Sequence, residues 1–286
     1  MPADRAALLD LAVEIAEEAG TLLAGFAQRR LDGEDLDVSA KSSATDPVSE
    51  ADRAAERLIA ERLLAARPDD GLLGEEDQAS RRGTSGLRWV VDPLDGTVNF
   101  LYGLPAWSVS VACEDDQGTL IGLVHHPSSG QTFRASRGEG AWRGQQRLAV
   151  SRVEDPARAL VATGFSYDPA TRVDQARDLL RLVPIVRDVR RFGSAALDLA
   201  WCAEGRVDGY VEFGLQPWDW AAGALLVTEA GGRFSLMQRR LGGHLRSGLV
   251  AAGPAMHAAL LAWLEVPAVP AAGVPPDPDP AAGAGA

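Results

Sequence analysis

The spacing of apolar side chains predicts two amphipathic helices near the start of the chain. Between residues 8 and 26, apolar side chains recur every three or four positions with charged side chains between them, which is typical of a helix that buries one face. A polar stretch over residues 32–45 follows. A second helix is predicted from about residue 48 to residue 66, because Ser49 or one of its neighbours can cap its start and Pro68 prevents its continuation.

Beyond the second helix the pattern changes to short apolar runs that are separated by turns containing Gly and Asp, which is typical of β-strands. Helical spacing returns between some of these runs. The sequence therefore predicts an α+β or mixed α/β fold with packed layers. We expect strands at residues 87–91, 109–113, 120–125, 131–135, 141–143, 160–163, 210–213, 233–236 and 249–252, and helices at 173–182, 194–202, 219–230 and 256–264.

The length of the chain, 286 residues, and its 46% share of hydrophobic residues allow one large core. We expect a single domain over residues 1–266, built from two packed lobes with their boundary near residues 145–160. Residues 267–286 contain mainly Pro, Ala, Gly and Asp and offer almost nothing to bury, so they are predicted to form a disordered tail.

The net charge and the cysteine content indicate which kinds of partner and which cellular compartment to expect. The formal net charge is −12 and Lys/Arg clusters are lacking, so direct nucleic-acid binding is not expected. An acidic protein that acts on an anionic substrate needs bound cations, which mildly favours a metal site. The two cysteines, Cys113 and Cys202, lack metal-ligand spacing and favour the reducing cytoplasm. Neither a signal peptide nor a membrane span is visible, so no membrane association is expected.

One acidic segment carries candidate chemistry. A buried strand delivers Asp92 at its end, a Pro turn places Asp95 three residues later, and Gly96 permits a tight turn into a helix. The Leu94 carbonyl and the Thr97 hydroxyl lie within local reach. Hard divalent cations such as Mg²⁺ bind oxygen donors of this kind, and free N–H groups at a helix start can bind phosphate. Taken alone, the segment is explained equally well as an ordinary turn between a strand and a helix.

Two further acidic elements change that balance. Glu75 follows an apolar pair in a run of acids, and such a run is usually a solvated face. Asp219 opens an apolar helix, where the commonest role of Asp is that of an N-cap. However, Trp218 and Trp220 flank Asp219 and would bury its carboxylate, which then needs a cation or hydrogen-bond donors. Ordinary explanations fit each element singly but explain their co-occurrence poorly.

Together these segments resemble the inositol monophosphatase family, within the wider superfamily of Li⁺-sensitive, Mg²⁺-dependent phosphatases. The two-part signature Asp-Pro-Leu-Asp-Gly-Thr and Trp-Asp-x-Ala-Ala-Gly is highly specific, and the resemblance covers nearly the whole chain except the tail. It implies a catalytic phosphatase domain with a layered αβαβα sandwich of the sugar-phosphatase type, a homodimer and inhibition by Li⁺. The residues on which the resemblance rests are Lys41 and residues 46–52, 74–76, 92–100, 193–196, 218–223 and 229–232.

The resemblance also implies a set of metal ligands. Glu75, Asp92 and the Leu94 carbonyl would hold one Mg²⁺. Asp92, Asp95 and Asp219 would hold a second, so that Asp92 bridges the two ions. A weaker third ion would lie near Glu75, and Mn²⁺ is a possible substitute for Mg²⁺.

Catalytic and substrate-binding roles follow from the same resemblance. Glu75 and Thr97 would orient and deprotonate the attacking water, and Asp52 would support Thr97. The amides of Gly96 and Thr97 would bind phosphate. The residues that would contact the substrate are Asp95, Gly96, Thr97, Ala195, Glu212 and Asp219.

The substrate is less determined than the chemistry, because related phosphatases act on inositol phosphates, fructose bisphosphate, nucleotide 3′-phosphates and histidinol phosphate. Residues 96–100 lack the Lys after Thr that is common in the nucleotide-directed branch, and Glu212 suits the hydroxyl groups of a polyol. We therefore expect an inositol-1-monophosphatase. The alternatives are a histidinol-phosphatase or another small sugar or polyol phosphatase, and a non-catalytic transcription-antitermination partner of RNA polymerase.

Removal of the C-terminal tail provides a first test. We predict that a chain truncated before Pro267 hydrolyses its substrate as fast as the full chain, because the tail offers almost nothing that could pack on the catalytic domain. Phosphate release by the two chains, assayed side by side, measures this. A large drop in the truncated chain would show that the tail takes part in the reaction.

Overall fold

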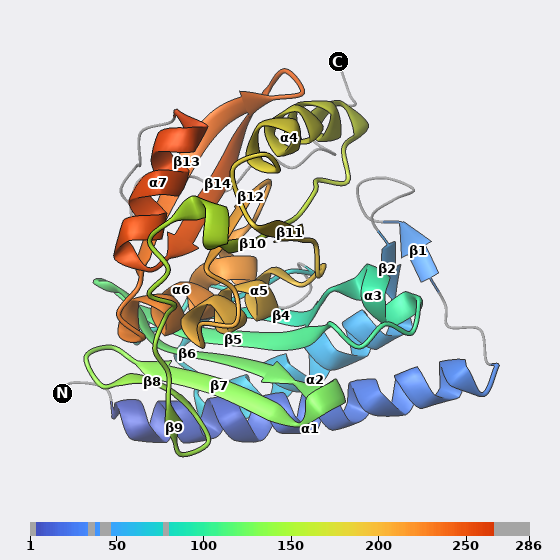
Figure 1. Cartoon of the computed structure of the whole chain (residues 1–286). Helices are drawn as coiled ribbons and strands as arrows, with labels where there is room; N and C mark the ends of the chain where they lie inside the picture. Colours follow the sequence, from blue (N-terminus) through green and yellow to red (C-terminus); the bar gives the residue numbers. More distant parts are fainter. Residues whose placement is uncertain (1–3, 34–37, 41–46, 77–79, 266–286) are drawn as a thin grey trace.

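Two of the three β-sheets in the described residues alternate with three layers of helices, which makes five layers, and the third sheet has only two short strands (Figure 1). This is the αβαβα arrangement that the resemblance implies, so the predicted fold class is confirmed. The predicted tail, together with Lys41 and Asp46, lies outside the described residues. The computed structural model describes residues 4–33, 38–40, 47–76 and 80–265.

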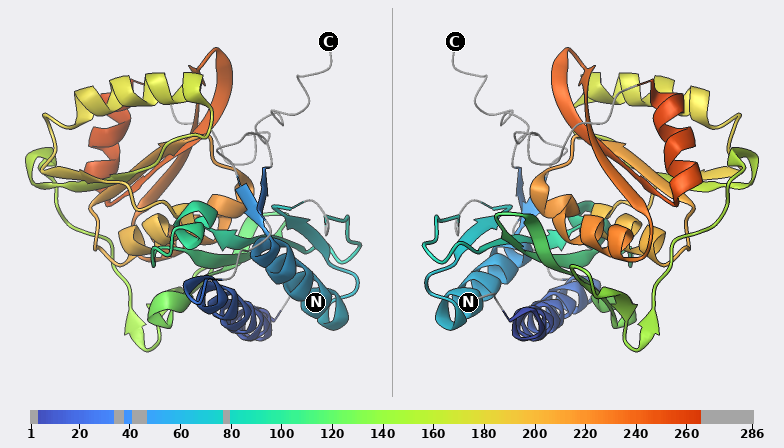
Figure 2. Two further views of the ribbon diagram at one scale, coloured as in Figure 1. Left: turned by 90° about the vertical axis from the view of Figure 1, so that its right-hand side faces the viewer. Right: turned by 90° about the vertical axis from the view of Figure 1, so that its left-hand side faces the viewer.

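The helices are α1 (Arg5–Leu31), α2 (Glu50–Ala66), α3 (Thr97–Leu101), α4 (Pro169–Leu182), α5 (Ala195–Ala203), α6 (Pro217–Glu229) and α7 (Pro254–Leu264), with 3₁₀ turns at Pro127–Ser129 and Pro156–Arg158. Helices α1 and α2 cover the outer face of one sheet, and α4 and α7 cover the outer face of the other. Helices α5 and α6 lie between the two sheets (Figure 2). None of the helices in the described ranges combines the length and the apolar character that crossing a bilayer requires.

The larger sheet has the strand order β3-β4-β5-β6-β7-β8-β9 and is antiparallel except for the pair β3–β4. The smaller sheet has the order β11-β10-β12-β14-β13, with β11, β10 and β12 parallel to one another. The strands are β1 (Val38–Ala40), β2 (Pro47–Ser49), β3 (Gly71–Gly74), β4 (Arg88–Asp95), β5 (Ser108–Asp115), β6 (Gly118–His126), β7 (Gln131–Ser136), β8 (Gly140–Arg143), β9 (Gln146–Arg147), β10 (Leu160–Thr163), β11 (Asp188–Arg190), β12 (Gly209–Phe213), β13 (Arg233–Leu241) and β14 (His244–Ala252).

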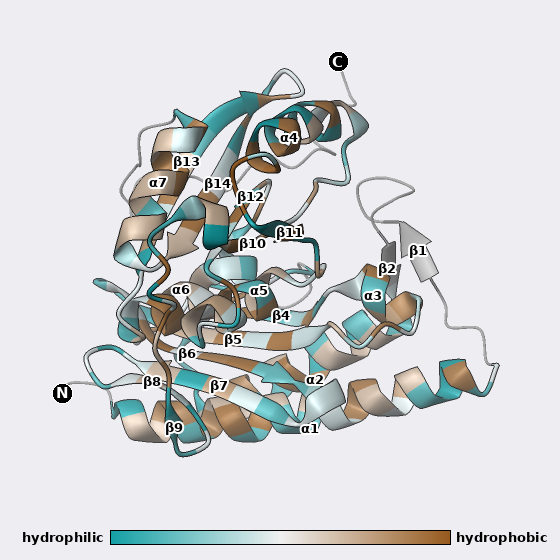
Figure 3. Ribbon diagram, in the orientation of Figure 1, coloured by the Kyte–Doolittle hydropathy of each residue, from teal (hydrophilic) through white to brown (hydrophobic). Residues whose placement is uncertain are grey.

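Because side chains point alternately to the two faces of each strand, the apolar core forms three clusters. One lies between the two large sheets and surrounds α5 and α6, and one lies on the outer face of each sheet. In β4, Trp89 and Val91 pack with α1 and α2, whereas Val90 packs with α5 and α6. In β12, Tyr210 packs with the middle helices, whereas Val211 packs with α4 and α7. Figure 3 shows that polar and apolar residues alternate along α1, which buries only part of its surface, whereas residues 221–227 of α6 are all buried.

Every strand and helix predicted from the apolar pattern is present, with shifted ends. The second helix begins at Glu50 because residues Pro47–Ser49 pair with β1 and Ser49 caps the helix. The largest difference is the hairpin of β13 and β14, which extends to the pair Leu241 and His244. Its outer half is rich in polar residues, so apolar periodicity does not reveal it.

The short strands β1, β2, β9 and β11 were not predicted, because two or three residues carry too little periodicity to distinguish a strand from a loop. The chain leaves the larger sheet after Arg147 and enters the smaller one at Leu160. This crossing falls in the region where the sequence predicts a boundary between lobes. The division into lobes itself stays a prediction.

Candidate metal centre and active site

Three carboxylates from two distant segments meet at the end of β4. Asp92 and Asp95 belong to the last part of this strand, where the pairing with β5 changes register, and Asp219 lies in the first turn of α6. One oxygen of each carboxylate lies within 4.8 Å of an oxygen of the other two. The exposed fractions of Asp92 and Asp95 are only 2% and 8%. The structure therefore brings together three of the residues that the sequence suggests as metal ligands.

The electrostatics of this cluster suit a cation, because burial and mutual repulsion disfavour the ionised carboxylates when no positive charge is present. Burial raises the pKa of Asp92 well above its usual value, and the neighbouring carboxylates, Glu75 first, raise it further. Asp219 is affected in the same way, first by burial and then by the charge of Asp95. Burial also raises the pKa of Asp95, to about 6, against the effect of its hydrogen bonds. Buried carboxylates at these distances form the donor set that Mg²⁺ prefers, so the residues present fit this metal.

The start of α5 binds Asp95 from the side of the smaller sheet. Ser194 Oγ donates a hydrogen bond to Asp95 Oδ2 at 2.5 Å, and the amides of Ala195 and Ala196 donate to Asp95 at 3.2 and 2.7 Å. Backbone N–H groups in the first turn of a helix lack intrahelical partners and favour negative charge. The Gly-Ser-Ala-Ala segment thus anchors the carboxylate cluster through Asp95, and it places Ala195 beside the carboxylates.

Thr97 and Asp52 form a hydrogen-bonded unit next to the cluster. Thr97 Oγ1 donates to Asp52 Oδ1 at 2.8 Å and lies 3.2 Å from the carbonyl oxygen of Leu94. Asp52 is fully buried, and its other oxygen accepts hydrogen bonds from the amide and the hydroxyl of Ser49 in the capping box of α2. The capping box of α2 holds the carboxylate of Asp52 in place, and this carboxylate in turn orients the hydroxyl group of Thr97.

Glu75 approaches the cluster from the end of β3. Its side chain is partly exposed, and it raises the pKa of Asp92 through its charge and a side-chain hydrogen bond. Glu56 Oε1 accepts the amide of Glu76 at 3.0 Å, and a Cβ at Gly74 would lie only 2.3 Å from this oxygen. Glu56 was not predicted to belong to the site, because a Glu within an amphipathic helix normally faces solvent, whereas this one is buried and holds the segment that carries Glu75.

Gly96 and Asn99 shape the turn that follows β4. Gly96 has a φ of +97°, and a Cβ there would lie 3.0 and 3.1 Å from the carbonyl oxygens of Ala106 and Gly193. The tight turn predicted at Gly96 is therefore confirmed. Asn99 Nδ2 donates to the carbonyls of Ala106 and Phe192, both at 2.6 Å. This role of Asn99 was not predicted, because one of its hydrogen-bond partners lies 93 positions away in the sequence.

Glu212 lies in β12, apart from the three clustered carboxylates. Tyr210 Oη donates a hydrogen bond to Glu212 Oε2 at 2.6 Å. Burial raises the pKa of Glu212 to about 7, and the charge of Glu212 raises the pKa of Asp219 and of the buried Asp198. Glu212 is thus close enough to the cluster to influence it, and its contact with substrate stays a prediction.

The chain matches the model of the inositol monophosphatase family over residues 4–266. It belongs to this family. A Mycobacterium tuberculosis protein named Inositol-1-monophosphatase SuhB is 42% identical over 275 residues, which cover 91% of this chain and 94% of that protein. An Escherichia coli protein named Nus factor SuhB is 37% identical over 259 residues, which cover 89% of this chain and 94% of that protein.

A solved structure shares the fold. The extragenic suppressor protein suhB from Bartonella henselae superposes with a TM-score of 0.82 at 36% identity, and the match covers 91% of this chain and 98% of that chain. The inositol monophosphatase family consists of metal-dependent phosphatases. The buried acidic cluster of Asp92, Asp95 and Asp219 agrees with that chemistry.

The electrostatics of the cluster predict an unusual dependence of stability on pH. Because the pKa values of Asp92, Asp95 and Asp219 are raised on folding, the metal-free folded state keeps protons that the unfolded state has released above about pH 4. The free energy of unfolding should therefore fall as the pH rises from about 4 through the folded-state values. In Asp92→Asn this fall should be smaller, and at pH 7 the metal-free variant should melt about 2–4 °C above the wild type, which corresponds to roughly 1 kcal/mol.

Thermal unfolding in a chelator at pH 5 and pH 7 measures this effect. The matched control is Asp116→Asn, which makes the same change at an exposed position and should follow the wild type. Millimolar Mg²⁺ should stabilise the wild type more than Asp92→Asn. Equal pH dependence in the wild type and Asp92→Asn would contradict the assignment of a strained acidic cluster.

Proposed function

We propose that the chain is a Mg²⁺-dependent phosphomonoester hydrolase that releases phosphate from a small polyol, with myo-inositol 1-phosphate as its preferred substrate. The observation that carries this proposal is the convergence of Asp92, Asp95 and Asp219 on one point, where Asp92 and Asp95 are buried and Asp219 is partly buried. Fixed negative charge of this density is costly to fold unless it binds cations. A cation-binding centre beside free backbone amides is suited to a phosphate ester.

Five residues would hold the metal: Glu75, Asp92, Asp95 and Asp219 through their carboxylates, and Leu94 through its carbonyl. We infer two to three ions, with Mn²⁺ as a possible substitute. When bound, the ions supply Lewis-acid chemistry, neutralising phosphoryl charge and making water a stronger nucleophile near neutral pH. Asp92 accepts the Leu94 amide at 2.9 Å, which fixes its carboxylate in the direction of its neighbours.

The attacking water would be oriented by Thr97 and Glu75. The proton of the Thr97 hydroxyl is directed at Asp52 Oδ1, so the hydroxyl oxygen keeps lone pairs that can accept a hydrogen bond from water. The Glu75 carboxylate would then take the proton that the water loses. Asp52 does not contact the substrate in this scheme and acts by holding Thr97.

The substrate would lie between the two sheets. Its phosphate would accept hydrogen bonds from the amides of Gly96 and Thr97, which begin α3. Its hydroxyl groups would contact Ala195 at the start of α5 and Glu212 on β12. They would also contact the carboxylates of Asp95 and Asp219. Relatives named inositol-1-monophosphatase are 42% and 44% identical to this chain, which supports a cyclic polyol over histidinol as the alcohol.

The proposal also includes two properties of the family resemblance. A homodimer is supported by the exposed apolar side chains Leu180, Val183 and Ile185 at and beyond the end of α4, whose exposed fractions are 77%, 55% and 42%. Inhibition by millimolar Li⁺ is the second property. We further infer that the enzyme acts in the cytoplasm, because its two described cysteines are free thiols.

The turnover of several phosphate esters tests this function. With Mg²⁺ present, kcat/KM should be highest for myo-inositol 1-phosphate, lower for histidinol phosphate, and lost in a chelator. Asp92→Asn should lower kcat by roughly 10³-fold, because it removes the charge of a carboxylate that would hold the metal, and should leave the fold intact. Asp116→Asn is the matched control. Hydrolysis that persists after thorough chelation, or in Asp92→Asn, would show that the metal assignment is wrong.

A second function is favoured by the names of other relatives. Proteins named Nus factor SuhB from Pasteurella multocida, Haemophilus influenzae and Escherichia coli are 41%, 38% and 37% identical to this chain. The corresponding proposal is a transcription-antitermination partner of RNA polymerase that acts without catalysis. Polymerase binding that survives Asp92→Asn while hydrolysis is lost would support it, and the absence of binding by the wild type would dismiss it.

A further inference from the structure

Glu212 is placed by the alternation of side chains along β12. It lies on the same face of the strand as Tyr210, which packs with α5 and α6, whereas Val211 packs on the opposite face with α4 and α7. Its carboxylate therefore occupies the side of the sheet on which α5 and α6 begin. The starts of these helices carry Ala195 and Asp219, so Glu212 borders the space that the substrate would enter.

Three neighbours define where the Glu212 carboxylate lies. Tyr210 donates a hydrogen bond of 2.6 Å to Oε2. Gly164, just after β10, leaves room for the carboxylate, because a Cβ at this position would lie 2.0 Å from Oε2 and 2.2 Å from Oε1. The charge of Arg191 attracts the ionised form and lowers the pKa of Glu212 against the larger effect of burial. A hydrogen bond, a steric gap and a counter-charge thus act on the same group.

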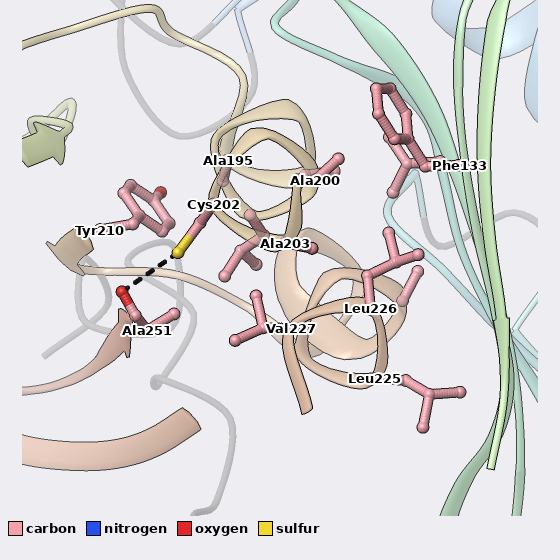
Figure 4. Close-up of a cluster of buried hydrophobic side chains, with 14 of the residues drawn as sticks. Phe133, Ala195, Ala200, Cys202, Ala203, Tyr210, Leu225, Leu226, Val227 and Ala251 are labelled. Atoms are coloured by element: carbon pink, nitrogen blue, oxygen red, sulfur yellow. Dashed lines mark hydrogen bonds between the residues drawn. The ribbon is translucent and has the colours of Figure 1, made fainter. Parts of the chain in front are cut away.

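Tyr210 is itself a rigid anchor. Its side chain is fully buried, and Figure 4 shows its ring in the apolar cluster with Ala195, Cys202 and Ala251. A buried phenol needs an acceptor for its hydroxyl, and Glu212 provides one. Burial and the charge of Glu212 raise the pKa of Tyr210 well above its usual value, so the phenol stays protonated and remains a donor. Packing fixes the position of the Tyr210 ring, and the hydrogen bond from its hydroxyl group then fixes the position of the Glu212 carboxylate.

We propose that Tyr210 is a positioning residue that fixes Glu212 as the acceptor for hydroxyl groups of the alcohol, and that it thereby sets the selectivity of the site for phosphate esters of polyols. This inference rests on the proposed function. Tyr210 occupies Oε2, so Oε1 is the oxygen available to a substrate hydroxyl. A carboxylate that is already immobilised loses little freedom when the alcohol binds, and an alcohol without further hydroxyl groups gains nothing from it.

The experiment compares two esters with Tyr210→Phe, which removes only the hydroxyl. For myo-inositol 1-phosphate we expect KM to rise about tenfold, because the acceptor is no longer held, while kcat changes by less than about threefold. For p-nitrophenyl phosphate, whose leaving group carries no further hydroxyl, kcat/KM should stay within about twofold of the wild type. Tyr102→Phe, at a position that is 78% exposed, is the matched control and should resemble the wild type with both esters.

A double-mutant cycle with Glu212→Gln separates positioning from a general effect on packing. If Tyr210 acts through Glu212, adding Tyr210→Phe to Glu212→Gln should leave KM for myo-inositol 1-phosphate within about twofold of the Glu212→Gln single variant. Gly164→Ala should displace the carboxylate by steric contact and reproduce the selective loss. Melting temperatures of all variants show whether the fold is kept.

The outcomes are distinct. Equal losses with both esters, no loss with either, or additive effects in the cycle would overturn the positioning role while leaving the phosphatase function in place. Failure of the wild type to hydrolyse either ester with Mg²⁺ present would overturn the proposed function and this inference together.

Discussion

The repulsion between buried carboxylates is the constraint on which the rest of the structure depends. Several negative charges lie at the end of β4, where burial alone already favours protonation. Each of the three clustered carboxylates is fixed by a backbone amide, that of Leu94 on Asp92, that of Ala196 on Asp95 and that of Gln216 on Asp219. Amides fix a carboxylate but carry no full charge, so without metal the cluster holds protons, and a bound cation would let all three carboxylates ionise together.

The layers that carry these charges must pack closely to keep the carboxylates together. Two glycines allow this close packing because they have no Cβ. A Cβ at Gly122 of β6 would lie 2.8 Å from the backbone of Ala222, so α6 rests almost directly on the larger sheet. A Cβ at Gly223 would lie 2.4 Å from the side chain of Leu199, so α5 and α6 are equally close to each other. Apolar packing at these contacts offsets part of the electrostatic cost and keeps Asp219 within reach of the strand that carries the other two carboxylates.

The sequence predicted those parts of the fold and site whose cause is local. Asp92, Asp95 and Gly96 lie within five residues, so strand, turn and helix start could be inferred together, and apolar periodicity located most elements. Glu56 and Tyr210 were not predicted as part of the site, because each has an ordinary local pattern: a helical Glu and an apolar strand residue. Their roles arise from partners in other elements, and no local pattern encodes which elements become neighbours.

Two hydrogen-bonded pairs lie beside the cluster: Thr97 with Asp52, and Glu212 with Tyr210. Thr97 donates to its partner, whereas Glu212 accepts from its partner. Nevertheless, Thr97 and Glu212 can both accept a hydrogen bond from a bound molecule. Asp52 accepts the hydrogen bond of the Thr97 hydroxyl, and the hydrogen bond from Tyr210 favours the ionised form of Glu212, so the Thr97 hydroxyl oxygen and the Glu212 carboxylate can both act as acceptors. Water and alcohol hydroxyls can donate to them, whereas phosphoryl oxygens cannot. On the proposed function, phosphate is therefore excluded from these two positions and directed to the amides of Gly96 and Thr97 and to the cations, which fixes the orientation of the ester before any bond breaks.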